Sequence, residues 1–93
     1  MTIEFEWDAA KAETNFRKHS VSFDEAVSAF YDALSVTIPD PDHSVNEARF
    51  LLIGMTVTRR LVVVGHTDRG RRVRIINARR ATRRERASYE KGR

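Results

Sequence analysis

The chain has 93 residues, the size of one domain spanning residues 1–93, and it contains no cysteine, which excludes disulfides and thiolate metal sites. Its net charge of +4 is unevenly divided: residues 1–57 hold four basic and ten acidic residues, whereas residues 58–93 hold thirteen basic and three acidic residues. The basic part favours a polyanionic partner through Coulomb attraction and counterion release, and a solvated arginine surface is the alternative.

The N-terminus gives no sign of a secretory leader, because it carries Glu4, Glu6 and Asp8 and no positively charged segment. No unbroken apolar run exceeds four residues, as in Leu61–Val64, whereas a membrane-spanning helix needs ~20. We therefore expect a soluble, cytoplasmic protein that does not associate with membranes.

Two helices are predicted near the N-terminus. Residues 1–7 alternate largely between apolar and acidic side chains, and this period of two predicts a short strand or an extended lead-in. Asp8 offers a carboxylate to the free amides of a helix over residues 9–18, in which Phe16 falls on the apolar inner face at helical spacing. Another face of this helix carries polar side chains: Lys11, Asn15 and Lys18.

The second helix is predicted over residues 23–31, because Ser22 and Glu25 have the spacing of a capping box. Phe23 opens an apolar stripe that recurs at helical spacing along it.

The rest of the chain is predicted to form a sheet and a last helix. Four segments of apolar and β-branched residues read as strands: 34–38, 49–57, 61–67 and 72–77. The last two links are short, which forces antiparallel neighbours. Thr82 and Glu85 repeat the capping-box spacing and predict a C-terminal helix that Gly92 ends. We therefore predict an α+β fold with two N-terminal helices, a four-stranded antiparallel meander sheet and a C-terminal helix.

The common catalytic motifs are missing, among them the phosphate-binding loop, the dinucleotide-binding glycine motif and the zinc-protease motif. His19, His43 and His66 are too scattered to read as a metal site, and no cofactor is implied. Arg72 and Arg74 alternate in the last predicted strand and point to one face. With His66 they can hold an RNA backbone, or they are simply the solvated side of the sheet.

Cleavage of RNA without a metal needs a general base, a general acid and a cation that stabilises the phosphoryl oxygens. His43 and Glu47 precede a predicted strand and can lie at the rim of the sheet, and Tyr89 lies on the last helix. Each has a structural alternative, since His43 can belong to a turn, Glu47 can pair with Arg49, and Tyr89 can pack. Spacing alone defines no site.

Three ordered blocks of residues resemble one known family. They are Trp7-Asp8, Lys11, Asn15, Lys18-His19, Val21, Phe23 and Ala26; then Asp42-His43-Ser44, Glu47, Arg49-Phe50 and Ile53-Gly54; then Arg74-Ile75-Ile76-Asn77-Ala78-Arg79, Ala81, Glu85 and Tyr89-Glu90. On these motifs, the chain is similar to the BrnT-type toxins of bacterial toxin–antitoxin pairs. One departure is Asn77, where the family usually has serine, and asparagine keeps a small hydrogen-bonding side chain.

The resemblance implies a RelE-like fold, metal-independent RNA cleavage that halts translation, and neutralisation by a BrnA-type antitoxin, through which the complex binds promoter DNA. The residues expected to be catalytic are His43, Glu47, Arg49, Arg74, Arg79 and Tyr89. The residues expected to contact RNA are Lys11, Lys18, His66, Arg72 and Arg83. Two alternatives stay open: a non-enzymatic module that binds nucleic acid or a protein, and an inactivated toxin that acts as a corepressor.

Overall fold

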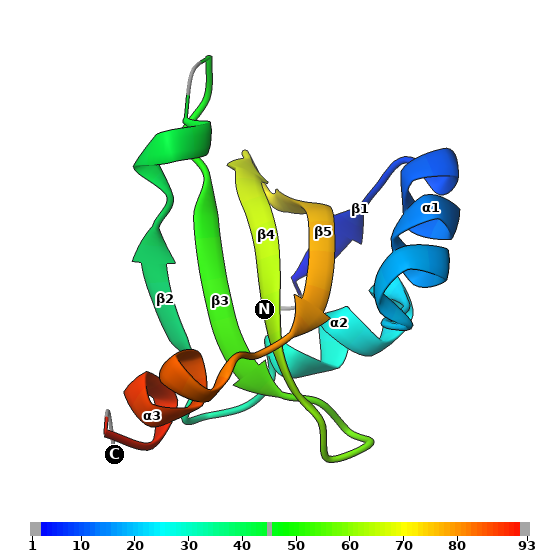
Figure 1. Ribbon diagram of the computed structural model, residues 1–93. Coiled ribbons are helices and arrows are strands. Elements are labelled where there is room, and N and C mark those ends of the chain that lie inside the picture. The colour runs from blue at the N-terminus through cyan, green and yellow to red at the C-terminus, as the bar shows by residue number, and fades with distance from the viewer. Residues whose placement is uncertain (1–2, 45, 92–93) are drawn as a thin grey trace.

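The computed structural model describes residues 3–44 and 46–91. In chain order they form β1 (Glu4–Glu6), α1 (Ala9–His19), α2 (Phe23–Ala29), β2 (Val36–Pro39), the 3₁₀ helix η1 (Pro41–His43), β3 (Phe50–Met55), β4 (Leu61–Arg69), β5 (Arg72–Arg80) and α3 (Arg83–Lys91) (Figure 1). The predicted helices and strands lie close to these bounds, although β5 runs three residues further than predicted, and η1 was not predicted. The start of the predicted lead-in strand, residues 1–2, and the predicted helix stop, Gly92, lie outside the described residues.

The sheet differs from the prediction in one strand. Strands β2 to β5 form the expected antiparallel meander, but β1 joins β5 in parallel, which gives a five-stranded mixed sheet in the order β1-β5-β4-β3-β2. The predicted four-stranded antiparallel sheet is therefore wrong. The length of a link indicates only how strands that follow each other in sequence pair. Strand β1 instead pairs with a strand far along the chain, with Glu4 opposite Arg72 and Glu6 opposite Arg74.

Helices α1 and α2 cover one face of the sheet and form the main core (Figure 1). The buried residues of this core are Val21, Phe23, Ala26, Ala29, Leu52, Val62, Val64, Ile75 and Ala78. Helix α2 approaches β3 so closely that a Cβ at Gly54 would lie 2.7 Å from the Ala29 carbonyl oxygen. A glycine is therefore required at this contact.

Helix α1 is held on the sheet edge by a polar residue rather than by its predicted aromatic one. Strand β1 pairs only with the first part of β5, and the Asn15 side chain bonds the edge of β5 further along. Its Nδ2 donates to the carbonyls of Ala78 and Val21 at 2.8 and 3.0 Å, and its Oδ1 accepts from the Ala78 N–H at 3.1 Å. Phe16, predicted on the inner face, is 54% exposed, because the edge strand needs hydrogen-bond partners there.

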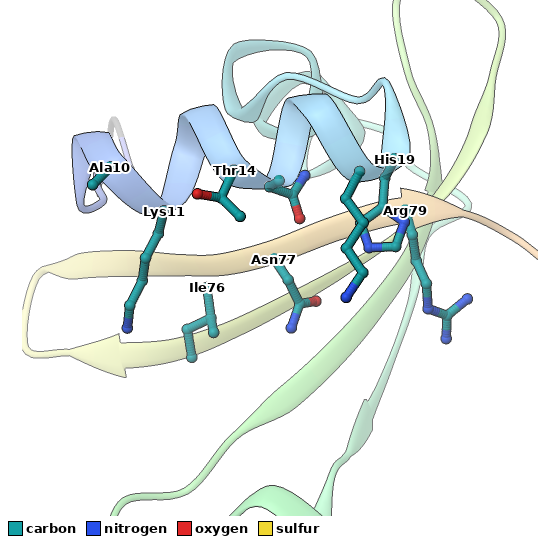
Figure 2. Close-up of a pocket in the computed structure, with 9 residues that line it drawn as sticks. Ala10, Lys11, Thr14, His19, Ile76, Asn77 and Arg79 are labelled. Atoms are coloured by element: carbon teal, nitrogen blue, oxygen red, sulfur yellow. The ribbon is translucent and has the colours of Figure 1, made fainter.

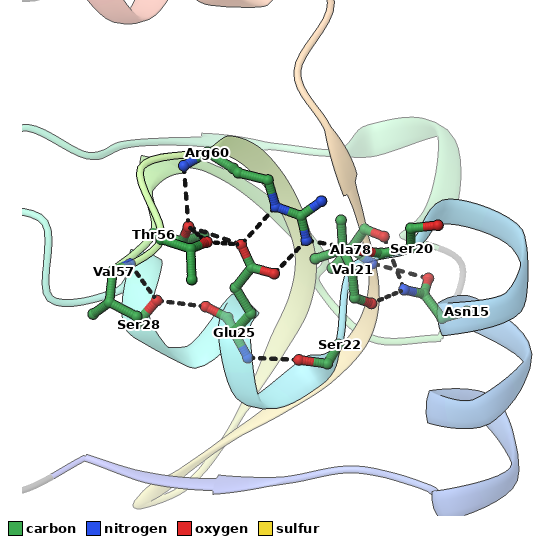
Figure 3. Close-up of polar contacts among 11 residues, drawn as sticks. Asn15, Ser20, Val21, Ser22, Glu25, Ser28, Thr56, Val57, Arg60 and Ala78 are labelled. Atoms are coloured by element: carbon green, nitrogen blue, oxygen red, sulfur yellow. Dashed lines mark hydrogen bonds and ion pairs between the residues drawn. The ribbon is translucent and has the colours of Figure 1, made fainter.

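Helix α2 is tied to the β3–β4 hairpin through Glu25 (Figure 3). The Ser22 hydroxyl accepts from the Glu25 N–H at 3.0 Å, as the capping box predicts. The Glu25 carboxylate, however, accepts hydrogen bonds from the Nε and one terminal nitrogen of Arg60. It also accepts from the hydroxyls of Thr56 and Thr58 at 2.9 and 2.6 Å. These bonds lower the pKa of Glu25 from 4.5 to about 2, the Arg60 hydrogen bond contributing most.

Helix α3 covers one end of the opposite face of the sheet (Figure 1). Its capping box is complete, since the Thr82 N–H donates to Glu85 at 2.8 Å and the Glu85 N–H donates to the Thr82 hydroxyl at 3.2 Å. Tyr89 packs in a second small core, whose other members are Leu51, Ile53, Met55, Leu61, Val63 and Ala81. None of the described helices is long and apolar enough to cross a bilayer.

A β-bulge interrupts the pairing of β4 with β5 on this second face. Gly65 pairs with Asn77, whereas His66 pairs with Ile75, so Ile76 is the extra residue. A bulge re-aims side chains and strengthens the local twist. Here Ile76 and Asn77 both line the surface hollows described next.

Candidate active site

Two hollows meet along β5. The larger, about 520 Å³, lies between α1 and β5 (Figure 2). Its α1 wall carries Ala10, Lys11, Thr14, Asn15, Lys18 and His19, and its β5 wall carries Ile76, Asn77 and Arg79. Lys11, Asn15 and Lys18 thus share one helix face as predicted, with Asn15 closing the helix onto the sheet.

The smaller hollow, about 170 Å³, lies on the other side of the bulge and reaches η1 and the start of β3. Its lining residues are Asp40, His43, Arg49, Phe50, Leu51, Gly65, His66, Ile76, Asn77 and Arg79. Because Ile76, Asn77 and Arg79 line both hollows, we treat the two as one surface, called the β5 groove from here on.

His43 and Asp40 form a pair at the rim of the β5 groove. The His43 Nδ1 lies 2.9 Å from the Asp40 Oδ2, and the imidazole is 67% exposed whereas the carboxylate is 16% exposed. An ionised carboxylate only accepts hydrogen bonds, so Nδ1 is the donor and carries the proton. In the neutral imidazole the Nε2 lone pair is then free to accept a proton from a substrate.

Arg49 lines the smaller hollow beside this pair. Its backbone N–H donates to the Ser44 hydroxyl at 2.9 Å, which fixes the chain where the η1 loop enters β3. Its Nε is buried and has no hydrogen-bond partner among the residues that the structure describes. A guanidinium that lines a hollow suits an anionic group such as a phosphate.

Arg79 contributes to both hollows but is already paired with a carboxylate. Its two terminal nitrogens each lie 2.8 Å from an oxygen of Glu85 in a bidentate pair. The pair raises the pKa of Arg79 and lowers the pKa of Glu85 from 4.5 to about 2. Arg79 therefore anchors the start of α3 to β5 while it lines the groove.

Glu47 lies near His43 and Arg49, around a separate hollow of about 300 Å³. Its carboxylate is 4.0 Å from a terminal nitrogen of Arg69. Of the residues predicted to be catalytic, the structure thus places His43, Glu47 and Arg49 close together. Arg79, also predicted to be catalytic, lines the β5 groove with His43 and Arg49, and it lines the larger hollow with Lys11 and Lys18, which were predicted to contact RNA.

Arg72 and Arg74 lie outside both hollows and face the acidic residues of β1. The Arg74 Nε donates to Glu6 at 3.0 Å, and Arg72 lies 3.7 Å from both Glu4 and Glu6. These contacts lower the pKa of Glu6, the Arg74 hydrogen bond contributing most. The two arginines predicted to hold RNA, Arg72 and Arg74, therefore already form ion pairs with carboxylates of β1.

Of the other two residues predicted to contact RNA, His66 has a buried imidazole and Arg83 lies outside both hollows. His66 is buried on the α2 side of β4, where the rings of Phe30 and Phe50 lie 4.9 and 5.9 Å from its ring, and burial lowers its pKa. His66 is nevertheless among the residues that line the smaller hollow. Arg83 is exposed at the first turn of α3.

Three residues of the groove were not predicted from the sequence as site residues: Asp40, His19 and Asn77. Asp40 holds His43 across the 3₁₀ turn, and the Asp-x-x-His spacing was the signal that could have identified it. His19 was considered only as a metal ligand, yet it lines the larger hollow at the end of α1 (Figure 2). Asn77 was noted only as a departure from serine, and it lies between the two hollows.

Tyr89 is 3% exposed, and its hydroxyl donates to the Asp32 carboxylate at 2.6 Å. Replacing it with phenylalanine should lower the free energy of unfolding by about 1–3 kcal/mol, because a charge-assisted buried hydrogen bond is lost while the ring still packs. Urea unfolding of the two proteins measures this difference. A fall in the predicted RNA cleavage with unchanged stability would instead support the predicted catalytic role of Tyr89.

Comparison with known proteins identifies the family. The family model for the ribonuclease toxin BrnT of type II toxin–antitoxin systems matches residues 7–85. Among solved structures, the chain is similar to the Brucella abortus ribonuclease toxin BrnT, with 23% identity and a TM-score of 0.63 over 88% of this chain and 100% of that one, a likeness in fold. No curated protein matches the sequence. Since the family model covers most of the chain, the protein belongs to the BrnT family of ribonuclease toxins of type II toxin–antitoxin systems.

Proposed function

We propose that this chain is an endoribonuclease toxin that cleaves RNA without a metal, and that the β5 groove is its active site. The observation that carries the proposal is the His43–Asp40 pair, which leaves the imidazole Nε2 free beside Arg49. The description of the family as a ribonuclease toxin supports the same class of reaction.

The reaction is a transesterification within the RNA chain. His43 Nε2 takes the proton of a ribose 2′-hydroxyl, the 2′-oxygen bonds to the adjacent phosphorus, and the bond from phosphorus to the 5′-oxygen breaks. The 5′-oxygen takes a proton from the other wall of the groove, where His19 lies. The products are a 2′,3′-cyclic phosphate end and a 5′-hydroxyl end.

Cations on both walls stabilise the charge that builds on the phosphoryl oxygens. Arg49 lies on the η1 side, and Lys18 and Lys11 lie on the α1 side. Glu47, close to His43, is a second candidate for proton transfer. Such cleavage, in a RelE-like toxin, inhibits translation by destroying messenger RNA.

We infer that a BrnA-type antitoxin neutralises the toxin and that the complex binds promoter DNA through the antitoxin. Membership of a type II family implies an antitoxin partner. The cations of the β5 groove favour an acidic antitoxin segment, which would exclude RNA by covering them.

The test is cleavage of end-labelled RNA in EDTA by purified toxin freed of its partner. The wild type should leave 2′,3′-cyclic phosphate ends, and His43→Gln should lower the rate by about 10²–10⁴-fold, because the positioned base is removed. Asp40→Asn should lower it less, since the imidazole stays but loses its ionised partner. Asp24→Asn removes the same charge from an exposed position on α2 and serves as the control.

Full activity of a folded His43→Gln protein would place the general base elsewhere and contradict the proposed mechanism. Tight binding of RNA or antitoxin by a wild type that cleaves nothing would contradict cleavage of free RNA, and would favour a ribosome-dependent toxin or a non-catalytic module.

A further inference from the structure

We propose that the smaller hollow of the β5 groove is a nucleobase pocket, in which the Asn77 amide hydrogen-bonds one unstacked base of the RNA. The inference rests on the proposed function, because it assigns part of the same groove to substrate selection. It adds a specificity-determining residue to the reacting groups on the rim.

The size of the hollow fits one flat ring system. At about 170 Å³ it is smaller than the roughly 300–1,000 Å³ of pockets that hold drug-sized ligands, so it has room for a base but not for a whole nucleotide. Leu51 and Ile76 supply apolar surface for the faces of the ring. Single-stranded RNA is commonly read in this way, with a base splayed out of the stack.

The β-bulge places Asn77 at this hollow. Gly65 lies directly opposite, and a Cβ there would lie 2.6 Å from the Asn77 Oδ1, so the absence of a side chain at Gly65 makes room for the amide. Within residues 3–44 and 46–91, the Asn77 amide makes no hydrogen bond. It thus offers a donor and an acceptor side by side, the pattern that the edge of a base requires.

Polar groups of both kinds complete the rim. Asp40 supplies a carboxylate acceptor and Arg49 a guanidinium, whose buried Nε has no partner among the described residues. A hollow with apolar walls and a few convergent polar groups recognises a polar ring better than an aliphatic chain.

The hollow also lies where an RNA strand would pass. Asn77 and Arg79 line it and also the larger hollow, whose α1 wall carries Lys11 and Lys18 (Figure 2). A strand whose phosphates lie along α1 can therefore place a neighbouring base in the smaller hollow. The scissile bond would then lie near His43, on the rim of the same hollow.

The test uses fluorescent RNA hexamers with 2′-fluoro sugars, which cannot be cleaved by 2′-hydroxyl attack. Each hexamer carries one kind of base throughout, A, C, G or U, so that the register of binding does not matter. For the wild type, the Kd of the best and the worst hexamer should differ by about tenfold, within the roughly 5- to 150-fold that one bidentate side-chain contact to a base supplies.

Two variants alter the amide in different ways. Asn77→Ala removes the amide, whereas Gly65→Ala keeps the amide but displaces it, since the added Cβ would clash with the end of the Asn77 side chain rather than with backbone. Both should bring the four Kd values to within about twofold of one another, in the range of the weakest wild-type hexamer. Thr37→Ala on the exposed face of β2 is the control and should keep the wild-type preference.

The outcomes separate this inference from the proposed function. Equal Kd values for the wild type, or a preference unchanged in both variants, would overturn the nucleobase pocket even if the wild type cleaves RNA. Loss of preference in both variants supports the pocket even if the wild type cleaves no free RNA. Matched 2′-hydroxyl hexamers should show the same loss of preference in cleavage rate.

Discussion

Replacing Asn15 by aspartate should lower the free energy of unfolding by about 3–5 kcal/mol at neutral pH, a large part of what a domain of this size has. Asparagine and aspartate have nearly the same shape, so the substitution tests the hydrogen-bond donors and the charge without changing the packing. Asn15 donates to the carbonyls of Ala78 and Val21 at 2.8 and 3.0 Å. Aspartate would turn both donations into contacts between a buried negative charge and carbonyl oxygens.

The measurement is urea unfolding of both proteins at pH 7, with Asn46→Asp as the control. Asn46 is exposed, so the same chemical change there should alter stability by less than about 0.5 kcal/mol. The Asn15→Asp loss should shrink in acid, where a protonated carboxyl can again donate one bond. A loss no larger than that of the control would show that the amide does not hold α1 on β5.

The capped helices and the meander were predictable because their determinants are local. Ser22 and Thr82 cap the helices that follow them, and the short β3–β4 and β4–β5 links force hairpins. Strand β1 was missed as part of the sheet because its partner lies far along the chain. Phe16 was misplaced because helical period cannot show that an edge strand needs Asn15 instead.

The charge asymmetry of the sequence also predicted only part of the candidate site. Several arginines of the basic part pair with carboxylates from the acidic part: Arg60 with Glu25, Arg69 with Glu47, and Arg72 and Arg74 with the glutamates of β1. The basic and acidic stretches thus partly neutralise each other in the fold. The family motifs pointed to His43 and Arg49. Asp40 and Asn77 could not be predicted in this way, because the 3₁₀ turn places Asp40 beside His43 and the bulge places Asn77 at the groove.

The free energy of unfolding should fall steeply in acid, and the contributions of Glu25 and Glu85 to this fall can be measured one at a time. Glu25 and Glu85 each have a pKa lowered from 4.5 to about 2, by their hydrogen bonds with Arg60 and Arg79 respectively. A carboxyl whose pKa is lower in the folded state stabilises the fold fully above pH 4.5, and this contribution is lost as the pH falls toward 2. Allowing for partial exposure, each contributes on the order of 2 kcal/mol, against a total stability of roughly 5–14 kcal/mol for a chain of this length.

Urea unfolding from pH 7 to pH 2.5 at low salt measures this loss, and Glu25→Gln isolates one carboxyl. The variant should be less stable than the wild type at pH 7, and the difference should shrink toward zero as the pH falls from 4.5 to about 2. Glu13→Gln, which breaks an exposed ion pair with Arg17, should follow the wild-type profile closely. His66, buried with a pKa lowered from 6.5, adds a loss that begins below pH 6.5 and is common to all three proteins. A difference between the wild type and Glu25→Gln that stays constant down to pH 2.5 would mean that Glu25 holds the β3–β4 hairpin through its shape rather than its charge.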